Sequence, residues 1–293
     1  MDRDLKRRLN GYNFTLKKTF GQNFISDQTL LTQIVSLSGI NSDTVVLEIG
    51  CGAGTLTSVL CETCKRVVGY EIDKRLDPII SDTLKDKNNY EIVFKDVMKE
   101  SLESIEKKLD DNYVLVANLP YYITTPIVMK FLENSTKISA MVVMVQEEVA
   151  NRFSAKEGSS DYGAITVAIN LRGQAEKVLR VGRENFTPVP KVDSAVVKIT
   201  IDKNKSKNID LPAVRQTVKA AFSGRRKTLV NNLINCFGLS RENAMQSLSC
   251  CNIKSNARGE ELSEKQFICL TEYLKSNFEE IYDKKENNNR KRK

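Results

Sequence analysis

The chain of 293 residues contains no histidine and no tryptophan. Without histidine there is no Ser-His-Asp or Cys-His nucleophile and no imidazole base, which excludes the hydrolases that need them. Because tryptophan is absent, any side chain that stacks on a ligand has to be Tyr, Phe or Arg. No stretch approaches about 18 consecutive apolar residues, and the charged start MDRDLKRRLN lacks the apolar core of a signal peptide. We therefore expect a cytoplasmic protein with no membrane partner.

The seven cysteines are odd in number and show no regular spacing. Such a set does not form a disulfide framework and fits a reducing compartment. Cys61 and Cys64 make one C-x-x-C pair, but no second pair or histidine stands at zinc-ligand spacing. We expect ordinary reduced thiols and no metal site.

The formal net charge of +8 is uneven along the chain. Residues 284–293, KKENNNRKRK, carry a net +5 of it, so the rest is only mildly basic. We interpret 284–293 as a basic disordered tail. The basic clusters at 6–8, 17–18 and 225–227 adjoin apolar or motif-bearing segments, which makes them better candidates for phosphate contacts.

Short β-branched runs, most of them separated by helix-length segments, predict a parallel sheet covered on both faces. The predicted strands are 44–49, 66–70, 91–94, 113–117 and 140–145. A helix over 27–37, with Asp27 as its N-cap, precedes the first strand. The run 194–201 alternates as an exposed or antiparallel edge strand would, and 164–171 fits a strand or a helix.

The composition changes after Ile201, where a polar, lysine-rich connector, DKNKSKNID, leads into helical patterns. We therefore expect a sheet domain over 1–202 and a helical domain over 203–283. Pro212 suits the first turn of one helix, and Gly238 suits the end of the next.

The first predicted strand leads into a glycine-rich turn, GCGAG, that begins at Gly50 and includes Gly52. Glycines let a ligand approach the backbone at the carboxyl edge of a sheet. The G-x-G-x-G spacing differs from the G-x-G-x-x-G of dinucleotide-binding turns, and Glu48 stands two positions before the first glycine. This combination favours S-adenosyl-L-methionine as the cofactor.

Two carboxylates follow the next strands. Glu71 stands roughly twenty residues after the glycines, where an acidic side chain can accept both ribose hydroxyls of a nucleotide. Asp96 follows the third strand and is a candidate acceptor for the amino group of the cofactor adenine. For Asp73 the alternative of a solvated carboxylate at a strand end stays open.

The fourth strand ends in Asn118-Leu119-Pro120-Tyr121. The lone pair of adenine N6 is delocalised into the ring, so N6 attacks a methyl group only when acceptors hold its hydrogens and reshape it. The Asn118 amide oxygen and the Leu119 carbonyl are candidate acceptors. Pro120 would stiffen the turn, and Tyr121 would stack on a base turned out of its helix. Each of these features follows a strand, so they would line one edge of the sheet.

Taken together, these residues resemble the ribosomal-RNA adenine N6,N6-dimethyltransferase family of the KsgA type, over nearly the whole chain. The resemblance implies a Rossmann-like class I methyltransferase sheet with a small C-terminal all-α domain. Segment 17–25, KKTFGQNFI, looks like the family motif that folds over the methionine end of the cofactor. By that resemblance, the cofactor contacts comprise Asn23, Ile25, Gly50, Gly52, Glu71, Asp96 and Asn118.

Segment 186–194, FTPVPKVDS, resembles the second target-base motif of the family. The resemblance implies that Phe186 packs on the adenine opposite Tyr121. Without this resemblance, the Pro-x-Pro stretch would be interpreted as a stiff connector, and the neighbouring aromatic residue as part of the core.

Segments 191–196 and 224–229 look like the enzymes of the small ribosomal subunit rather than the resistance methylases of the large subunit. The resemblance implies dimethylation at N6 of two adjacent adenosines near the 3′ end of small-subunit ribosomal RNA. It also implies a pre-assembled small subunit as the substrate and a monomeric protein.

Two readings from other classes stay open. Related folds serve as assembly or transcription factors in which catalysis is dispensable, although an intact Asn118–Tyr121 segment speaks against lost activity. The glycine turn taken alone also fits an NAD-dependent oxidoreductase.

Overall fold

A computed structural model describes residues 3–12, 14–15, 22–109 and 112–282. The chain divides into two compact units. The first unit comprises 1–154 and 174–201, and the second comprises 155–173 and 202–293. The larger segment of the second unit begins at Asp202, next to the boundary expected from composition. The unit also includes 155–173, which we had expected in the sheet domain.

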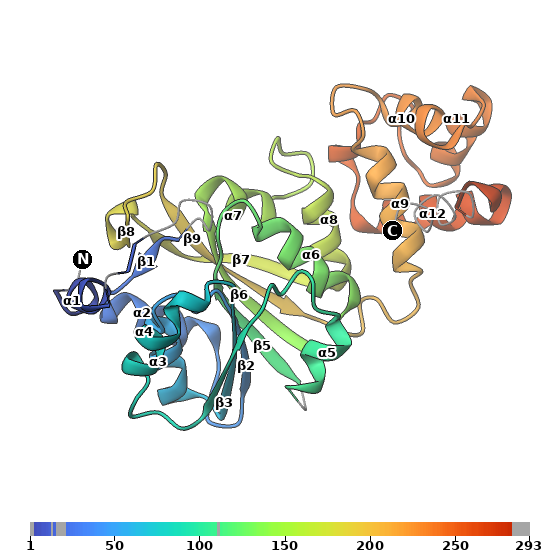
Figure 1. The fold of residues 1–293 in the computed structure, drawn as a ribbon. Coiled ribbons are helices and arrows are strands. Elements are labelled where there is room, and N and C mark those ends of the chain that lie inside the picture. Colours follow the sequence, from blue (N-terminus) through green and yellow to red (C-terminus); the bar gives the residue numbers. More distant parts are fainter. Residues whose placement is uncertain (1–2, 13, 16–21, 110–111, 283–293) are drawn as a thin grey trace. The chain divides into compact units, whose positions relative to one another are not determined.

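The first unit is built on a seven-stranded sheet with the order β4-β3-β2-β5-β6-β9-β7 (Figure 1). The strands are β2 Val45–Ile49, β3 Arg66–Glu71, β4 Tyr90–Phe94, β5 Tyr113–Asn118, β6 Ile138–Gln146, β7 Gly173–Val181 and β9 Ser194–Ile201. The five strands β2 to β6 pair in parallel, and β9 pairs antiparallel to β6. All five predicted parallel strands are confirmed.

The far end of the sheet differs from the prediction in two ways. The run 194–201 is antiparallel as expected, but β9 is not at the edge, because β7 lies outside it. Its alternation is incomplete, since Val196 and Val197 are both fully buried. The edge strand β7 has the polar sequence GQAEKVLRV and gave no strand signal. The ambiguous segment 164–171 is helical.

Helices cover both faces of the sheet. In the first unit they are α1 Arg3–Gly11, α2 Gln28–Ser38, α3 Thr55–Thr63, α4 Asp77–Thr83, α5 Leu102–Lys107, α6 Thr124–Asn134 and α7 Glu147–Phe153, with short 3₁₀ turns at Lys74–Leu76 and Arg183–Asn185. The predicted cap is confirmed, since Asp27 accepts hydrogen bonds from the first amides of α2. Helices α2 and α3 bury Ile34 and Leu60 against strand residues such as Val46. On the opposite face, Phe131 of α6 meets Tyr113 edge to face.

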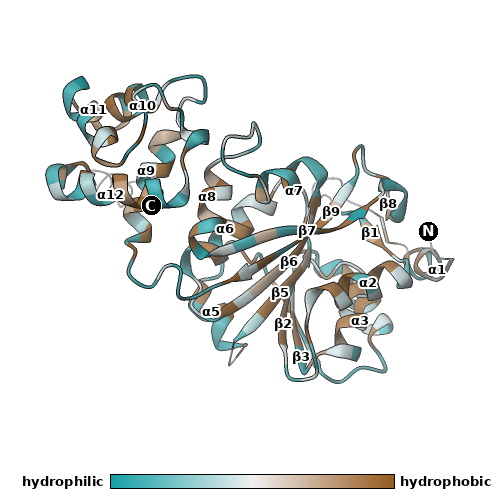
Figure 2. Ribbon diagram, turned by 180° about the vertical axis from the view of Figure 1, so that it is seen from behind, coloured by the Kyte–Doolittle hydropathy of each residue, from teal (hydrophilic) through white to brown (hydrophobic). Residues whose placement is uncertain are grey.

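The hydropathy of the strands explains this layering. Residues 45–49 of β2 are all buried, and the central strands are predominantly hydrophobic (Figure 2). A strand with helices on both sides cannot alternate between polar and apolar residues, because neither of its faces meets water. Because β2, β3, β4 and β5 run parallel, their carboxyl ends meet at one edge of the sheet, and this edge carries the site described below.

A two-residue ribbon joins two distant parts of the first unit. Strand β1, Phe24–Ile25, pairs antiparallel with β8, Phe186–Thr187, and Ile25 lies opposite Phe186. The N-terminal segment thereby lies beside the segment that leads into β9.

The second unit is helical. Its helices are α8 Ala164–Arg172, α9 Leu211–Ala221, α10 Leu229–Phe237, α11 Arg241–Cys250 and α12 Glu264–Phe278, with a 3₁₀ turn at Gly259–Glu261. Pro212 stands in the first turn of α9, and Gly238 ends α10 in a left-handed conformation, as predicted. Leu229, Leu233 and Phe267 are fully buried in one apolar cluster with residues of α8. In the part of the chain that the structure describes, no helix is long and apolar enough to cross a bilayer.

Candidate active site

A cleft opens at the carboxyl edge of the sheet, with an empty volume of about 1170 Å³ that includes its opening to solvent. The predicted site residues that line it are Asn23, Ile25, Gly50, Gly52, Glu71, Asp96, Asn118, Leu119, Pro120 and Tyr121. The structure thus brings together ten of the eleven predicted residues, from the segment 23–25 and from four different strand ends. Phe186 is the exception.

The glycine turn between β2 and α3 requires its glycines. Gly50, Gly52 and Gly54 have φ angles of 80°, 57° and 78°, a left-handed region that other residues rarely adopt. Space is also short, because a Cβ atom on Gly52 would lie 3.0 Å from the ring of Phe24, and one on Gly50 would lie 3.4 Å from the Asn118 carbonyl oxygen. The backbone itself is therefore exposed toward the cleft.

Glu71 ends β3 and ties the glycine turn to this strand. One carboxylate oxygen accepts a hydrogen bond from the Gly52 amide, and the other accepts bonds from the amides of Ile72 and Asp73, all at 2.9 Å. The residue is only 6% exposed, and its burial raises the pKa of the Glu71 carboxyl although the three amides oppose the rise. The carboxylate is fixed at the cleft wall before any ligand arrives.

Asp96 lies in a loop that another side chain holds in place. Its carboxylate accepts a hydrogen bond from the Met98 amide at 2.9 Å. Lys130 of α6 donates to the carbonyl oxygens of Val97 and Glu100 at 2.6 and 2.5 Å. Charge-assisted bonds of this length hold the loop firmly, so the position of Asp96 is defined.

Asn118 is oriented by the N-terminal segment. Its side-chain nitrogen donates to the Asn23 carbonyl oxygen at 3.0 Å, so the amide oxygen is left as the acceptor for another group. Leu119 is 1% exposed, and it contributes to the cleft with Asn118. The Asn118 side-chain amide and the Leu119 residue, whose backbone carbonyl is the second predicted acceptor, thus lie side by side at the end of β5.

The two predicted aromatic residues are placed differently. Tyr121 lines the cleft, and its hydroxyl lies 2.8 Å from the Ser194 hydroxyl, which fixes the ring. Burial raises the pKa of Tyr121, so this hydroxyl stays neutral near pH 7. Phe186 does not line the cleft; it is 1% exposed and packs in the core with Ile25 and Val181. Its predicted contact with a target base therefore stays a prediction.

Some residues of the cleft were missed from the sequence. Ile72 and Tyr122 both line it and are 48% and 65% exposed, which is unusual for large apolar side chains. Ile72 directly follows Glu71, and Tyr122 directly follows Tyr121. A large apolar or aromatic residue directly after each predicted contact residue was the signal available in the sequence.

The candidate phosphate contacts are described in part. Arg225, Arg226 and Lys227 lie in the second unit and are exposed. The side chain of Lys6, both lysines at 17–18 and the tail at 284–293 lie outside the described side chains.

Comparison with known proteins gives consistent matches. The sequence model of the family described as ribosomal RNA adenine dimethylase matches residues 13–276. The chain is 41% identical over 277 residues to the ribosomal RNA small subunit methyltransferase A of Bacillus licheniformis, covering 92% of this chain and 95% of the relative. It is 42% identical over 266 residues to the protein of the same name from Clostridioides difficile, covering 90% and 92%.

Solved structures agree with these matches. A dimethyladenosine transferase from Plasmodium falciparum superposes with a TM-score of 0.75 at 26% identity, covering 86% of this chain and 98% of that one. The 23S rRNA methyltransferase ErmE superposes with a TM-score of 0.64, also at 26% identity, covering 86% and 99%.

Proposed function

The chain belongs to the ribosomal RNA adenine dimethylase family, and on this premise we propose that it dimethylates N6 of adenosines in small-subunit ribosomal RNA. The methyl donor is S-adenosylmethionine, and the product is N6,N6-dimethyladenosine. One observation carries the proposal: the glycine turn, Glu71, Asp96 and Asn118 come from four strand ends and line a single cleft.

The cleft has the chemistry that the cofactor requires. Glu71 would accept the ribose hydroxyls, and Asp96 would accept a hydrogen bond from the adenine amino group. Ile72 would pack on the face of the adenine ring, which explains why an apolar side chain is left exposed beside Glu71. Asn23, Ile25 and Gly50 would surround the methionine end, close to Asn118.

S-adenosylmethionine supplies a methyl group that is already activated, so the protein has to position the acceptor and to exclude water. The Asn118 amide oxygen and the Leu119 carbonyl would hold the two hydrogens of adenine N6 and direct its lone pair toward the cofactor. Because the Asn118 nitrogen is held by Asn23, its oxygen faces away from that bond. No histidine base is needed for these tasks.

Tyr121 would hold the target base by stacking, since its ring is fixed by Ser194. Phe186 would have to leave the core to pack on the opposite face of the base, as the resemblance to the family predicts. Ser194 supports the role of Tyr121, whereas the pairing of Phe186 with Ile25 would have to open for Phe186 to reach the base.

The wider context of the reaction is part of the proposal. We expect two adjacent adenosines near the 3′ end, a pre-assembled small subunit as the substrate, a monomeric protein and a cytoplasmic location. The exposed residues 225–227 would contact RNA phosphates from the helical unit.

The test is the transfer of labelled methyl groups from S-adenosylmethionine to unmodified small subunits, large subunits and free RNA in parallel, followed by nucleoside analysis. We expect dimethyladenosine in small-subunit RNA alone. Label in large-subunit RNA would instead assign the chain to the resistance methylases. Cofactor binding without label in any substrate would favour a factor that binds RNA without modifying it.

A further inference from the structure

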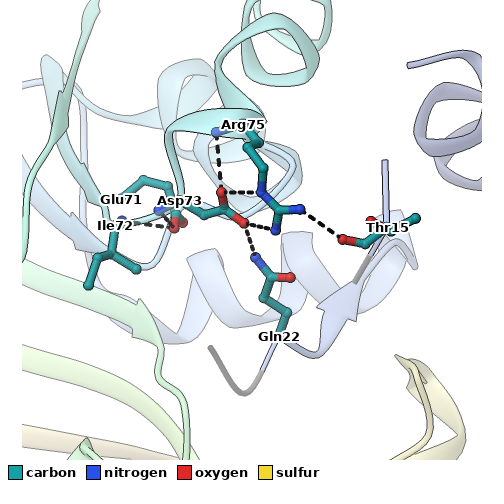
Figure 3. A network of polar contacts seen from close by, with 6 residues as sticks. All are labelled: Thr15, Gln22, Glu71, Ile72, Asp73 and Arg75. Atoms are coloured by element: carbon teal, nitrogen blue, oxygen red, sulfur yellow. Dashed lines mark hydrogen bonds and ion pairs between the residues drawn. The ribbon is translucent and has the colours of Figure 1, made fainter. Parts of the chain in front are cut away.

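An ion pair between the buried Asp73 and the partly exposed Arg75 lies beside Glu71 and has no part in the function proposed above. The Asp73 side chain is 3% exposed, and Arg75 binds it with two hydrogen bonds, from Nε to Oδ1 at 2.9 Å and from a terminal nitrogen to Oδ2 at 2.6 Å (Figure 3). Burial alone would raise the pKa of Asp73, but the bonds from Arg75 and Gln22 outweigh it and keep the pKa below its usual value. The carboxylate is therefore ionised, and it is not the solvated group that we had left open.

This pair fastens the N-terminal segment at two points (Figure 3). Gln22 donates from its side-chain nitrogen to Asp73 Oδ2 at 2.9 Å. Arg75 donates to the Thr15 carbonyl oxygen at 3.2 Å, and its guanidinium lies 4.9 Å from the centre of the Phe14 ring. Thr15 and Gln22 are seven positions apart in the sequence, yet both are held by the same pair.

The fastened segment forms one side of the cleft. We call residues 22–25 the N-terminal wall, because all four line the cleft. The Asn23 carbonyl oxygen in this wall accepts the bond that orients Asn118, and the Ile25 carbonyl oxygen accepts a bond from the Thr55 hydroxyl at 2.7 Å. On the other side of the ion pair, the backbone amide of Asp73 donates a hydrogen bond to the Glu71 carboxylate. The ion pair thus stands between the N-terminal wall and the carboxylate of the ribose site.

We propose that Asp73 and Arg75 are positioning residues that hold the N-terminal wall against the cleft and so set the affinity for the methionine end of the cofactor. Neither side chain lines the cleft. The inference rests on the proposed function, because it takes the cleft to be the site of S-adenosylmethionine. It assigns to this ion pair an effect on one part of the ligand only.

The selectivity follows from the geometry. Glu71 is bound by the Asp73 backbone amide, which a change of the Asp73 side chain leaves in place. The Gln22 bond depends on the Asp73 carboxylate, and the Thr15 bond depends on the Arg75 guanidinium. Loss of the pair should therefore release the N-terminal wall while the ribose and adenine contacts stay intact.

The test uses two ligands and three variants of the full chain. S-adenosylhomocysteine contains both ends of the cofactor, whereas 5′-deoxy-5′-methylthioadenosine lacks the amino-acid end. The variants are Asp73→Asn, Arg75→Met and the control Arg66→Met. Arg66, at the start of β3, is 36% exposed like Arg75 and forms a 2.7 Å ion pair with Glu91, so its replacement is a matched loss of an arginine ion pair. Titration calorimetry measures both affinities, and a thermal melt reports the stability of each variant.

We expect Asp73→Asn and Arg75→Met to weaken S-adenosylhomocysteine binding about tenfold or more, and methylthioadenosine binding by no more than about twofold. Arg66→Met should change neither affinity. Equal losses for both ligands would mean that the pair only supports the fold, and unchanged affinities would mean that the wall does not depend on it. Either result overturns the inference.

Arg75→Met keeps the test decisive if Asp73→Asn does not fold, because Arg75 is partly exposed and its methionine replacement retains an apolar stem over Phe14. A wild-type chain that binds neither ligand would contradict the proposed function itself. Wild-type binding with no effect in either variant would contradict the positioning role alone.

Discussion

Both units bury neutral polar side chains, but among the described residues only the first unit buries carboxylates. In the first unit, three carboxylates gather around the glycine turn, with Glu48, Glu71 and Asp73 exposed by only 1%, 6% and 3%. Neither oxygen of Glu48 has a hydrogen-bond partner among the described residues, and the same holds for the hydroxyl of Thr57. An unpaired buried carboxyl group lowers stability.

The polar residues that are fully buried in the second unit are neutral and paired, whereas Oγ of Ser159 and Oε1 of Gln216, in partly buried residues, have no partner among the described residues. Thr217 shares hydrogen bonds with Tyr282 and Thr271 at 2.8 and 2.9 Å. Asn232 is 1% exposed and donates to the carbonyl oxygens of Ala221 and Gly224 at 2.7 and 3.2 Å. Among the residues described in this unit, no carboxylate is buried.

The difference separates two tasks. Buried carboxyl groups next to an exposed backbone turn, with Glu71 at the cleft itself, suit a nucleotide cofactor, and they are retained at a cost in stability. Paired neutral groups in a helical core stabilise one arrangement and contribute nothing to ligand chemistry. Changes in the first unit should therefore alter affinity, rate or pH dependence, and changes in the core of the second should alter stability alone.

The largest effect is expected for Asn118→Ala. Removal of an acceptor that directs N6 should lower kcat/KM on small subunits about a thousandfold, roughly 4 kcal/mol in the activation barrier, because such groups act mainly in the transition state. Cofactor affinity should fall far less. Asn134→Ala, at an exposed site on α6, is the matched control and should retain full activity. A similar rate for both variants would contradict the role of Asn118.

Glu48→Gln tests the stability cost of a buried carboxyl group in the first unit through the pH dependence of unfolding. Burial, with a smaller repulsion from Glu71, raises the pKa of Glu48 from 4.5 to about 7. Between these values the unfolded chain releases a proton that the native chain keeps, so the free energy of unfolding falls as pH rises, by about 3 kcal/mol in total.

Urea unfolding at several pH values should show Glu48→Gln about 3 kcal/mol more stable than wild type at pH 8, with the difference vanishing below pH 4.5. A constant difference across this range would show that titration of Glu48 is not its cause.

Asn232→Ala addresses the other side of the comparison. It removes the Asn232 donor from the buried Ala221 carbonyl oxygen, while the Gly224 carbonyl oxygen keeps the Lys227 amide, and this should cost about 2 kcal/mol of unfolding free energy. S-adenosylhomocysteine affinity should stay within about twofold of wild type. The neighbouring Asn231→Ala, at an exposed site of α10, should change neither quantity. A large loss of cofactor affinity in Asn232→Ala would break the separation of tasks.

The smallest effect is expected for Tyr122→Ala. An aromatic ring that is 65% exposed at the cleft is suited to stack on a nucleotide next to the target. Its removal should raise KM for small subunits about fivefold, roughly 1 kcal/mol, with cofactor affinity unchanged, and Tyr122→Phe should restore KM. Tyr12→Ala, also at an exposed tyrosine, serves as the control. An unchanged KM in Tyr122→Ala would exclude the stacking role.

The sequence predicted those features that depend on local pattern. Five continuous apolar runs identified the parallel strands, and residues that follow a strand end, such as Glu71 and Asn118, were correctly placed at one edge. Features that depend on distant partners were not predicted. Strand β7 is polar because it lies at the sheet edge, and the burial of Phe186 depends on its pairing with Ile25. The burial of Asp73 depends on Arg75 and Gln22, which no spacing rule connects.

The most direct measurement is the calorimetric titration of S-adenosylhomocysteine into the wild-type chain and into Glu71→Gln. Glutamine has the same shape but carries no charge, and it offers one acceptor oxygen in place of the two that bind three amides. We predict that the wild type binds and that Glu71→Gln binds at least about tenfold more weakly. Equal affinity in the two proteins would contradict the claim that the buried Glu71 carboxylate holds the cofactor.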